Sequence, residues 1–213
     1  MRTCAIVVAA GAGTRFGAAK QFVPLRGARV AHHAVAAAGA ACDEVVVVLP
    51  PATEWDGPPV SRAVAGGATR SESVRAGMAA LPIGVEIVVV HDAARPLATA
   101  GLFRSVITAV ENGADGAVPA VSVADTVKRV EGDRVVETID RRGLVSVQTP
   151  QAFLVEALRR AHDGDPEATD DAALVELVGG EVVVVPGDPR NLKITTAMDL
   201  EFAMALLTGG DAS

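Results

Sequence analysis

The sequence predicts an α/β protein: a three-layer α/β/α sandwich around a mainly parallel, Rossmann-like sheet. Short valine-rich runs recur along the 213 residues, and segments with helical spacing lie between them. Runs that are apolar at every position are typical of strands buried on both faces, as in parallel sheets. The alternation of such strands with helices is typical of layered α/β domains.

Five strands are expected, at residues 5–10, 45–49, 87–90, 116–121 and 182–185. Six helices are expected, at residues 30–41, 73–81, 102–112, 153–162, 170–178 and 197–207. Ser71 or Ser73 is the candidate N-cap of the second helix, because a serine hydroxyl satisfies a free backbone N–H at a helix start. Ligands in such folds bind at the carboxyl ends of the strands, so the loops that follow the strands are the candidates for chemistry.

One stretch departs from this rhythm. Residues 126–140, "TVKRVEGDRVVETID", alternate polar and apolar residues around a glycine, which predicts a β-hairpin. The surrounding segment, 124–147, has little room for a core of its own, so we expect it to project as an arm from a single domain spanning 1–213. An exposed apolar stripe usually needs a partner, often a second copy of the chain, so the arm is the predicted dimerisation element.

Composition excludes some classes of partner. The net charge is −7 and no basic block stands out, which argues against nucleic acid as the principal partner. No apolar run reaches the ~20 residues of a membrane span. The two cysteines form no CxxC motif, and we expect a reducing, cytoplasmic setting.

The first strand is followed by a glycine-rich loop, "VAAGAGTRFG", at residues 8–17. Its glycines match neither the G-x-G-x-x-G dinucleotide fingerprint nor the P-loop. Free backbone N–H groups at a helix start, flanked by Arg15 and Lys20, would nevertheless suit a phosphate. The alternative is a tight turn that carries exposed basic side chains.

Two further loops carry polar residues. In "AGGATRSESVRAG", residues 65–77, two glycines permit close approach of a ligand, although helix capping alone would also explain the serines. In "VVVHDAARP", residues 88–96, Asp92 follows a buried strand, where it could bind a metal or a sugar hydroxyl or cap the next turn. His91 has no cluster of ligating residues around it, so we expect a structural role. Asp170 and Asp171 open a later helix and are expected to cap it.

The motifs fall in an order that resembles the 2-C-methyl-D-erythritol 4-phosphate cytidylyltransferase family. They are "VVAAGAGTRFG…KQF", "GGATRSESVRAG", "HDAARP", "ADTVKR", "DRRGL…TPQ", "ATDDA" and "NLKIT", and they cover nearly the whole chain. The first motif alone marks the wider nucleotidyltransferase superfamily, whereas "HDAARP" with the arm and "TPQ" is far more specific. The resemblance implies transfer of a cytidylyl group from CTP to methylerythritol phosphate, with release of pyrophosphate.

The resemblance also implies residue roles. Arg15 and Lys20 would be catalytic, stabilising the triphosphate and the charge that develops at the α-phosphorus. The nucleotide would be held by Ala9, Ala10, Gly11, Ala12, Gly13, Gly67, Arg70, Ser73, Asp92 and Ala93. Methylerythritol phosphate would be held by Asp92, Arg95, Thr126, Arg141, Thr149, Thr169 and Lys193, with Thr126 and Arg141 reaching across a dimer interface. Mg²⁺ would be held mainly by the CTP phosphates, with Asp92 a candidate ligand.

The chemistry agrees with a site that lacks a catalytic triad, because a phosphomonoester is already mostly dianionic at neutral pH and needs no general base. Three alternatives stay open: an enzyme for another alcohol phosphate such as ribitol 5-phosphate, a sugar-1-phosphate guanylyl- or uridylyltransferase, and a non-catalytic nucleotide-binding protein. Two features depart from the family pattern. Only "FGAA" separates Arg15 from Lys20, and Ala68 stands where many relatives carry an acid. Some relatives are fused to a cyclodiphosphate synthase, a domain we expect this chain to lack.

Overall fold

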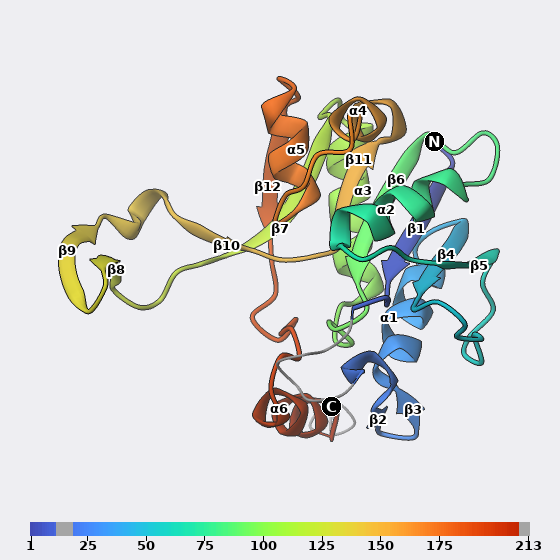
Figure 1. The fold of residues 1–213 in the computed structure, drawn as a ribbon, viewed down its shortest axis with the longest axis horizontal. Helices are drawn as coiled ribbons and strands as arrows, with labels where there is room; N and C mark the ends of the chain where they lie inside the picture. The colour runs from blue at the N-terminus through green and yellow to red at the C-terminus, as the bar shows by residue number, and fades with distance from the viewer. Residues whose placement is uncertain (12–18, 209–213) are drawn as a thin grey trace.

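A computed structural model describes residues 1–11 and 19–208. Its centre is an eight-stranded sheet with helices on both faces (Figure 1). The strands are β1 (Thr3–Val8), β4 (Glu44–Leu49), β5 (Arg62–Ala65), β6 (Ile87–Asp92), β7 (Gly116–Ser122), β10 (Val145–Val147), β11 (Gln151–Leu154) and β12 (Val182–Pro186). The order is β10-β7-β11-β6-β1-β4-β5, and β12 pairs with β7. Within this sheet, every antiparallel pair in the described ranges involves β10 or β11, and all the other pairs are parallel, so the predicted mainly parallel sheet is confirmed.

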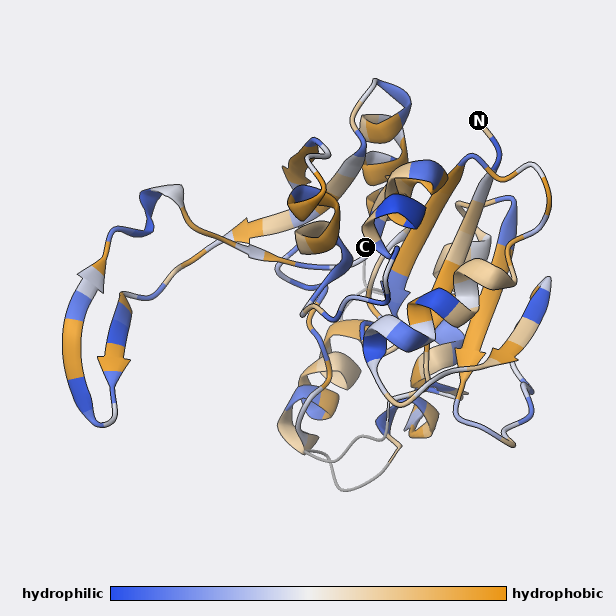
Figure 2. Cartoon of the chain, turned by 45° about the horizontal axis from the view of Figure 1, so that its top comes forward, coloured by the Kyte–Doolittle hydropathy of each residue, from blue (hydrophilic) through white to orange (hydrophobic). Residues whose placement is uncertain are grey.

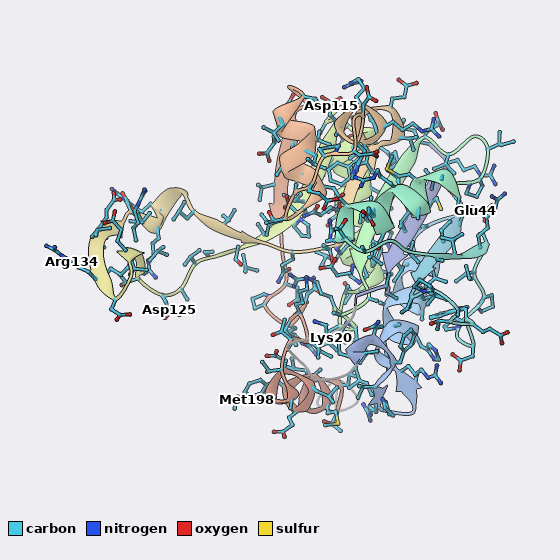
Figure 3. The ribbon with its side chains drawn as sticks, viewed as in Figure 1. Lys20, Glu44, Asp115, Asp125, Arg134 and Met198 are labelled. Atoms are coloured by element: carbon cyan, nitrogen blue, oxygen red, sulfur yellow. The ribbon has the colours of Figure 1, made fainter. Side chains whose placement is uncertain are left out.

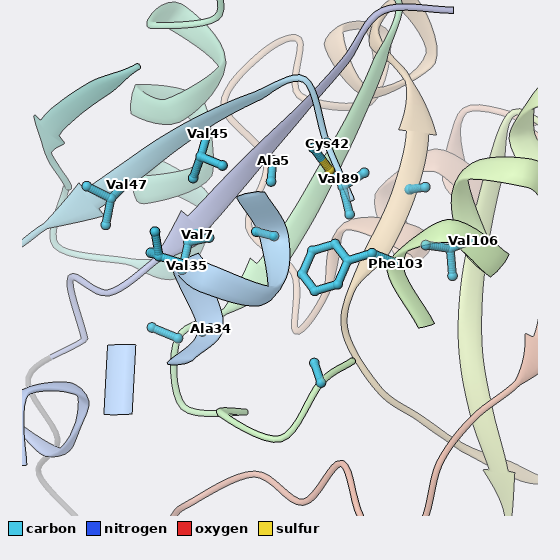
Figure 4. Packing of buried hydrophobic residues seen from close by; sticks show 14 of the residues in the cluster. Ala5, Val7, Ala34, Val35, Cys42, Val45, Val47, Val89, Phe103 and Val106 are labelled. Atoms are coloured by element: carbon cyan, nitrogen blue, oxygen red, sulfur yellow. The ribbon is translucent and has the colours of Figure 1, made fainter. Parts of the chain in front are cut away.

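The apolar strands are buried on both faces, as their composition predicts. In β1, Ala5 and Val7 face one core, while Cys4 and Ile6 face the other. The first core contains α1 (Val30–Gly39) and α3 (Ala100–Glu111), and Figure 4 shows Phe103 of α3 beside the strand residues. The second core contains α2 (Arg70–Ala79), α4 (Val155–Ala161) and α5 (Asp171–Leu177). The three predicted layers are therefore present.

Smaller elements lie at the bottom of the view in Figure 1. The 3-10 turn η1 (Lys20–Phe22) precedes the short strands β2 (Pro24–Leu25) and β3 (Ala28–Arg29). The last helix, α6 (Ala197–Thr208), packs against them through a third small apolar cluster. Among the helices of the described ranges, none has the length and apolar character needed to cross a membrane.

The prediction of a helix at residues 153–162 was wrong at its start. Phe153 belongs to β11, which inserts antiparallel between β6 and β7, and the helix α4 begins only at Val155. The apolar sequence runs from strand into helix, and Leu154 at the N-cap makes no side-chain capping bond. Nothing in the sequence therefore marks the boundary. The short strands β5 and β10 were also missed, because β5 is largely exposed and β10 has only three residues.

The predicted N-cap of α2 was also wrong. The helix begins at Arg70, and the Thr69 hydroxyl caps it by accepting a hydrogen bond from the Glu72 backbone N–H. Ser71 and Ser73 are both buried inside the helix. In α5, by contrast, Asp170 is the cap, as expected, whereas Asp171 turns into the protein interior.

The predicted hairpin is present as β8 (Val127–Glu131) and β9 (Arg134–Ile139), a two-stranded sheet of its own. Gly132 at its turn has φ +57°, a backbone conformation that glycine adopts without strain. Figures 1 and 2 show this arm extending away from the body of the molecule. The chain returns to the body through η2 (Arg141–Gly143) and β10. Exposed apolar side chains occur along this segment: Val130, Val135, Val136, Leu144, Val145 and Val147.

Candidate active site

The carboxyl edge of the sheet brings the first and third predicted loops together. The parallel register of β1 and β6 pairs Val8 with Asp92, and the Ala93 backbone N–H donates to the Val8 carbonyl at 3.1 Å. Asp92 is the last residue of β6 and is buried. Since β1 and β6 are neighbours in the middle of a parallel sheet, their ends lie where ligands bind in this class of fold.

A cavity of about 210 Å³ opens at this edge. It is lined by six residues that were predicted as site residues, namely Arg70, Asp92, Arg95, Thr149, Thr169 and Lys193. Four residues that were not predicted as site residues complete the lining: Val147, Gln148, Gln151 and Asp170. Residues from five separate parts of the chain therefore converge on one polar cavity.

Asp92 is the electrostatic centre of this cavity. Its Oδ2 accepts a hydrogen bond from Lys193 Nζ at 2.6 Å, and its Oδ1 accepts one from Arg70 Nε at 3.3 Å. Burial alone would raise the pKa of the Asp92 carboxyl, but the cations of Arg70 and Lys193 outweigh it and hold the pKa well below its usual range. Asp92 is therefore ionised at neutral pH.

Thr149, in the connection between β10 and β11, is bonded to the end of β6. Its hydroxyl accepts a hydrogen bond from the Asp92 backbone N–H at 3.0 Å and lies 3.1 Å from Nδ1 of His91. The other ring nitrogen of His91 lies 3.2 Å from the Arg95 carbonyl, which only accepts, so Nε2 carries the proton and Nδ1 accepts from Thr149. Burial lowers the pKa of His91 to about 4, so the ring is neutral and its role is structural, as expected.

The side chains of Gln148 and Asn191 brace the cavity, a role that sequence reasoning missed. Asn191 is fully buried and donates through Nδ2 to the Thr149 carbonyl at 2.9 Å. The backbone carbonyl of Asn191 accepts from Arg95 NH1 at 2.7 Å, which fixes the guanidinium at the cavity wall. Gln148 donates to the Asp188 carbonyl at 2.9 Å. The polar residues around the Thr-Pro pair are the only signal in the sequence that indicates this framework.

The second predicted loop packs against the end of β1. A Cβ atom built on Gly66 would lie 2.5 Å from Cβ of Ala10 and 2.7 Å from Oγ of Ser73, so only glycine permits this approach. The Gly67 backbone N–H donates to the Ser73 hydroxyl at 3.3 Å. The predicted nucleotide contacts Ala10, Gly67 and Ser73 are therefore neighbours.

Gln21 ties the chain beyond the first loop back to β1. Its buried amide donates to the carbonyls of Ala9 and Gly11 at 2.7 and 2.9 Å, and it follows Lys20 directly in η1. Lys20 is thereby kept at the same end of the sheet, and Figure 3 shows it on the body of the molecule. The predicted site residues Ala12, Gly13 and Arg15 lie outside the described residues.

Thr126 and Arg141 do not line the cavity of their own chain. Both are exposed, Thr126 just before β8 and Arg141 in η2. Figure 3 labels Asp125, the neighbour of Thr126, on the arm, away from Lys20. The Arg141 guanidinium donates to the Val123 carbonyl at 3.2 Å, which joins the two ends of the arm.

Carboxylates and other ligating groups do not form a metal cage in the part of the chain that the structure describes, since no group of three or more His, Cys, Asp or Glu side chains comes together. The candidate ligand Asp92 has both oxygens engaged by cations. Asp92 would therefore hold a divalent ion only together with the phosphate groups of a substrate, which is how Mg²⁺ is usually bound.

Strand ends that meet the Gly66–Gly67 loop on one side and a polar, cation-lined cavity on the other agree with the class of protein that the motifs indicate, a nucleotidyltransferase. The family model for 2-C-methyl-D-erythritol 4-phosphate cytidylyltransferase matches residues 3–209. The chain belongs to this family.

Relatives and solved structures agree with this assignment. The enzyme of that name from Streptomyces avermitilis is 43% identical over 97% of this chain and 92% of its own length. A bifunctional IspD/IspF enzyme from Anaeromyxobacter is 46% identical, and the chain spans 57% of that relative. The crystal structure of the cytidylyltransferase from Thermus thermophilus superposes with a TM-score of 0.84 at 35% identity, covering 98% of this chain and all of that one.

Proposed function

We propose that the cavity around Asp92 is the methylerythritol phosphate subsite and that CTP lies against the Ala9–Gly11 backbone, Ala93, Gly67 and Ser73. The enzyme transfers a cytidylyl group from CTP to 2-C-methyl-D-erythritol 4-phosphate in isoprenoid biosynthesis. A phosphate oxygen of the acceptor forms a bond to the α-phosphorus, the bond to the bridging oxygen breaks, and pyrophosphate leaves. Five residues that were expected to hold methylerythritol phosphate converge on this cavity, together with Arg70, which was expected to hold the nucleotide, and this convergence supports the placement.

The charge of the cavity suits a phosphate. Three cations line it, Arg70, Arg95 and Lys193, against the two carboxylates of Asp92 and Asp170. Lys193 is 39% exposed, so it reaches an incoming anion more readily than Arg70, which is 23% exposed. The Thr169 hydroxyl can donate to a phosphate oxygen or bond to a polyol, whereas the Thr149 hydroxyl, which donates its proton to His91, can only accept from a polyol hydroxyl. The cavity therefore offers both the charge and the hydrogen-bonding groups that a sugar-alcohol phosphate needs.

The chemical step is electrostatic in this proposal. An anion attacks a polyanion, so catalysis requires screening of charge and alignment of the reactants more than proton transfer. Arg15 and Lys20 stabilise the triphosphate and the charge at the α-phosphorus. CTP enters as its Mg²⁺ complex, and the ion's charge offsets that of the phosphates.

The arm completes the site in a homodimer. Neither Thr126 nor Arg141 lines the cavity of its own chain, and the arm extends away from the body (Figure 2). The exposed valines of the arm are an apolar surface that a second copy would cover. In this arrangement each cavity receives Thr126 and Arg141 from the arm of the partner. We place the enzyme in the cytoplasm, where its two buried cysteines stay reduced.

The function is tested by pyrophosphate release with CTP and Mg²⁺. We expect turnover with methylerythritol 4-phosphate and little with ribitol 5-phosphate, and CTP to exceed ATP, GTP and UTP as donor. Turnover with ribitol 5-phosphate alone would support a cytidylyltransferase but contradict methylerythritol phosphate as its acceptor. Nucleotide binding without pyrophosphate release from any pair would contradict the enzymatic assignment.

A further inference from the structure

Asp171 is a buried carboxylate beside the cavity that the reaction described above does not use. It is the first residue of α5, and its side chain is only 1% exposed. It does not cap the helix, because Asp170 already does so by accepting from the Ala173 backbone N–H at 3.0 Å. A buried carboxylate is costly unless it is paired, so its partners indicate its role.

Two side chains bind Asp171 through different oxygens. Arg70 NH1 donates to Oδ2 at 2.8 Å, and His162 Nε2 lies 3.1 Å from Oδ1. His162 comes from the end of α4 and is itself only 2% exposed. Because each oxygen has its own partner, rotation of the carboxylate would lose a contact. His162 thus fixes the orientation that Asp171 presents to Arg70.

Arg70 connects Asp171 to the cavity. Its NH1 contact with Asp171 is shorter than its Nε contact with Asp92, at 2.8 against 3.3 Å, so Asp171 is its main anchor. On the far side of Asp92, Lys193 binds the second carboxylate oxygen at 2.6 Å. Charges of alternating sign therefore run from the interior to the cavity wall. Burial lowers the pKa of Arg70, but the two carboxylates outweigh this and raise it, so the guanidinium stays charged.

We infer that Asp171, oriented by His162, is a positioning residue that fixes Arg70 and, through it, Asp92 and Lys193. While Asp171 holds NH1, Arg70 shares only one oxygen of Asp92 and leaves the other to Lys193. Without Asp171, the remaining carboxylate contact of Arg70 is Asp92. Arg70 then moves closer to Asp92 and competes with Lys193 for its carboxylate oxygens. The inference rests on the proposed function, since it takes methylerythritol phosphate to be the ligand of this cavity.

The first test is Asp171→Asn, which keeps the side-chain volume and removes the charge. Pyrophosphate release is measured with each substrate varied while the other is saturating. We expect the KM for methylerythritol phosphate to rise about tenfold, while kcat and the KM for CTP change by less than about threefold. Asp171→Glu, which keeps the charge, is expected to recover part of the lost affinity.

The second test places the same substitution in an Arg70→Met background. If Asp171 acts only through Arg70, Asp171→Asn causes no further rise in the KM for methylerythritol phosphate in this background. The effects of the two substitutions are then not additive, whereas a purely structural role of Asp171 would give additive effects. The double variant also avoids an unpaired buried charge, so it is the safer protein to fold. Should Asp171→Asn alone fail to fold, His162→Phe loosens the carboxylate without removing it and is expected to raise the same KM by a smaller factor.

The control is Asp43→Asn, the same substitution at an exposed aspartate. Asp43 also accepts two hydrogen bonds, from the backbone and hydroxyl of Thr3 at 2.8 and 2.9 Å, but at the opposite end of the sheet. We expect it to lower stability and leave both KM values unchanged. Wild-type enzyme that fails to use methylerythritol phosphate would contradict the proposed function. Normal wild-type turnover with an unchanged KM in folded Asp171→Asn, or an equal rise with and without Arg70, would overturn this inference alone.

Discussion

Replacement of Asp92 by asparagine removes the charge on which Arg70 and Lys193 converge. The pair with Lys193 is partly exposed, so its loss costs about 0.5–1 kcal/mol. Arg70 is more buried but retains Asp171, so the loss is smaller than the 3–5 kcal/mol of a fully orphaned buried charge, about 1–2 kcal/mol. We expect Asp92→Asn to lower the free energy of unfolding by about 2 kcal/mol at pH 7, or Tm by ~4–8 °C for a domain of this size.

The pH dependence gives the sharper test. The folded-state pKa of Asp92 is depressed, so its contribution to stability is complete above the pKa of an unfolded aspartate and is lost as the pH falls. The difference in unfolding free energy between wild type and variant should be constant from pH 7 to 5. Below about pH 4 it should shrink by up to about 1.4 kcal/mol per pH unit.

Thermal and urea unfolding of both proteins between pH 7 and 3 measure this difference. Asp56→Asn serves as the control, because Asp56 forms an exposed pair with Arg29 and its replacement should change stability by less than about 0.5 kcal/mol. A deficit in Asp92→Asn that stays constant to pH 3 would refute the argument that charge at Asp92 stabilises the fold.

Three further predictions concern the catalytic cations, the arm and the cysteines. Arg15→Ala or Lys20→Ala should leave the fold intact and lower kcat at least about a hundredfold, and near-normal pyrophosphate release by either variant would contradict a catalytic role for that residue. Arg141→Ala and Lys193→Ala should each be nearly inactive. A mixture of the two variants that exchanges subunits should regain about a quarter of wild-type activity, because half of the dimers are then mixed and each mixed dimer carries one intact site out of two. No recovery despite subunit exchange would exclude an arm that acts in the partner's site. Burial raises the pKa of both Cys4 and Cys42 to about 12, so iodoacetamide at pH 8 should label neither in the folded protein and both in urea, as read by mass spectrometry.

The core of the fold was predictable because strands that are buried on both faces consist mainly of apolar residues. Strands such as β1 and β6 are mostly apolar, and short runs of this kind are typical of strands covered on both faces. β11 was not predictable, because its pairing with β6 and β7 depends on long-range contacts that the local pattern does not encode. The boundary with α4 was lost for the same reason.

The site was predictable where a polar residue follows a buried strand, as Asp92 does. The partners of Asp92 come from α2 and from the segment before α6, and spacing along the chain does not say that these meet. Asp171 shows the limit most clearly. Its position beside Asp170 at a helix start favours capping, and only the packing of α5 against the sheet shows that one aspartate caps while the other faces inward.

The arm is joined to the body at a single point of the sheet. Ser122, the last residue of β7, and Val145, the first of β10, are Cα partners in an antiparallel pair. A two-residue turn can connect such neighbours, so residues 123–144 are an insertion that the sheet could close without. In the proposed homodimer, the residues that bring two chains together would therefore lie outside the residues that form the sheet. We expect that exchanging the arm for that of a relative would change which chains associate and leave the central sheet as it is.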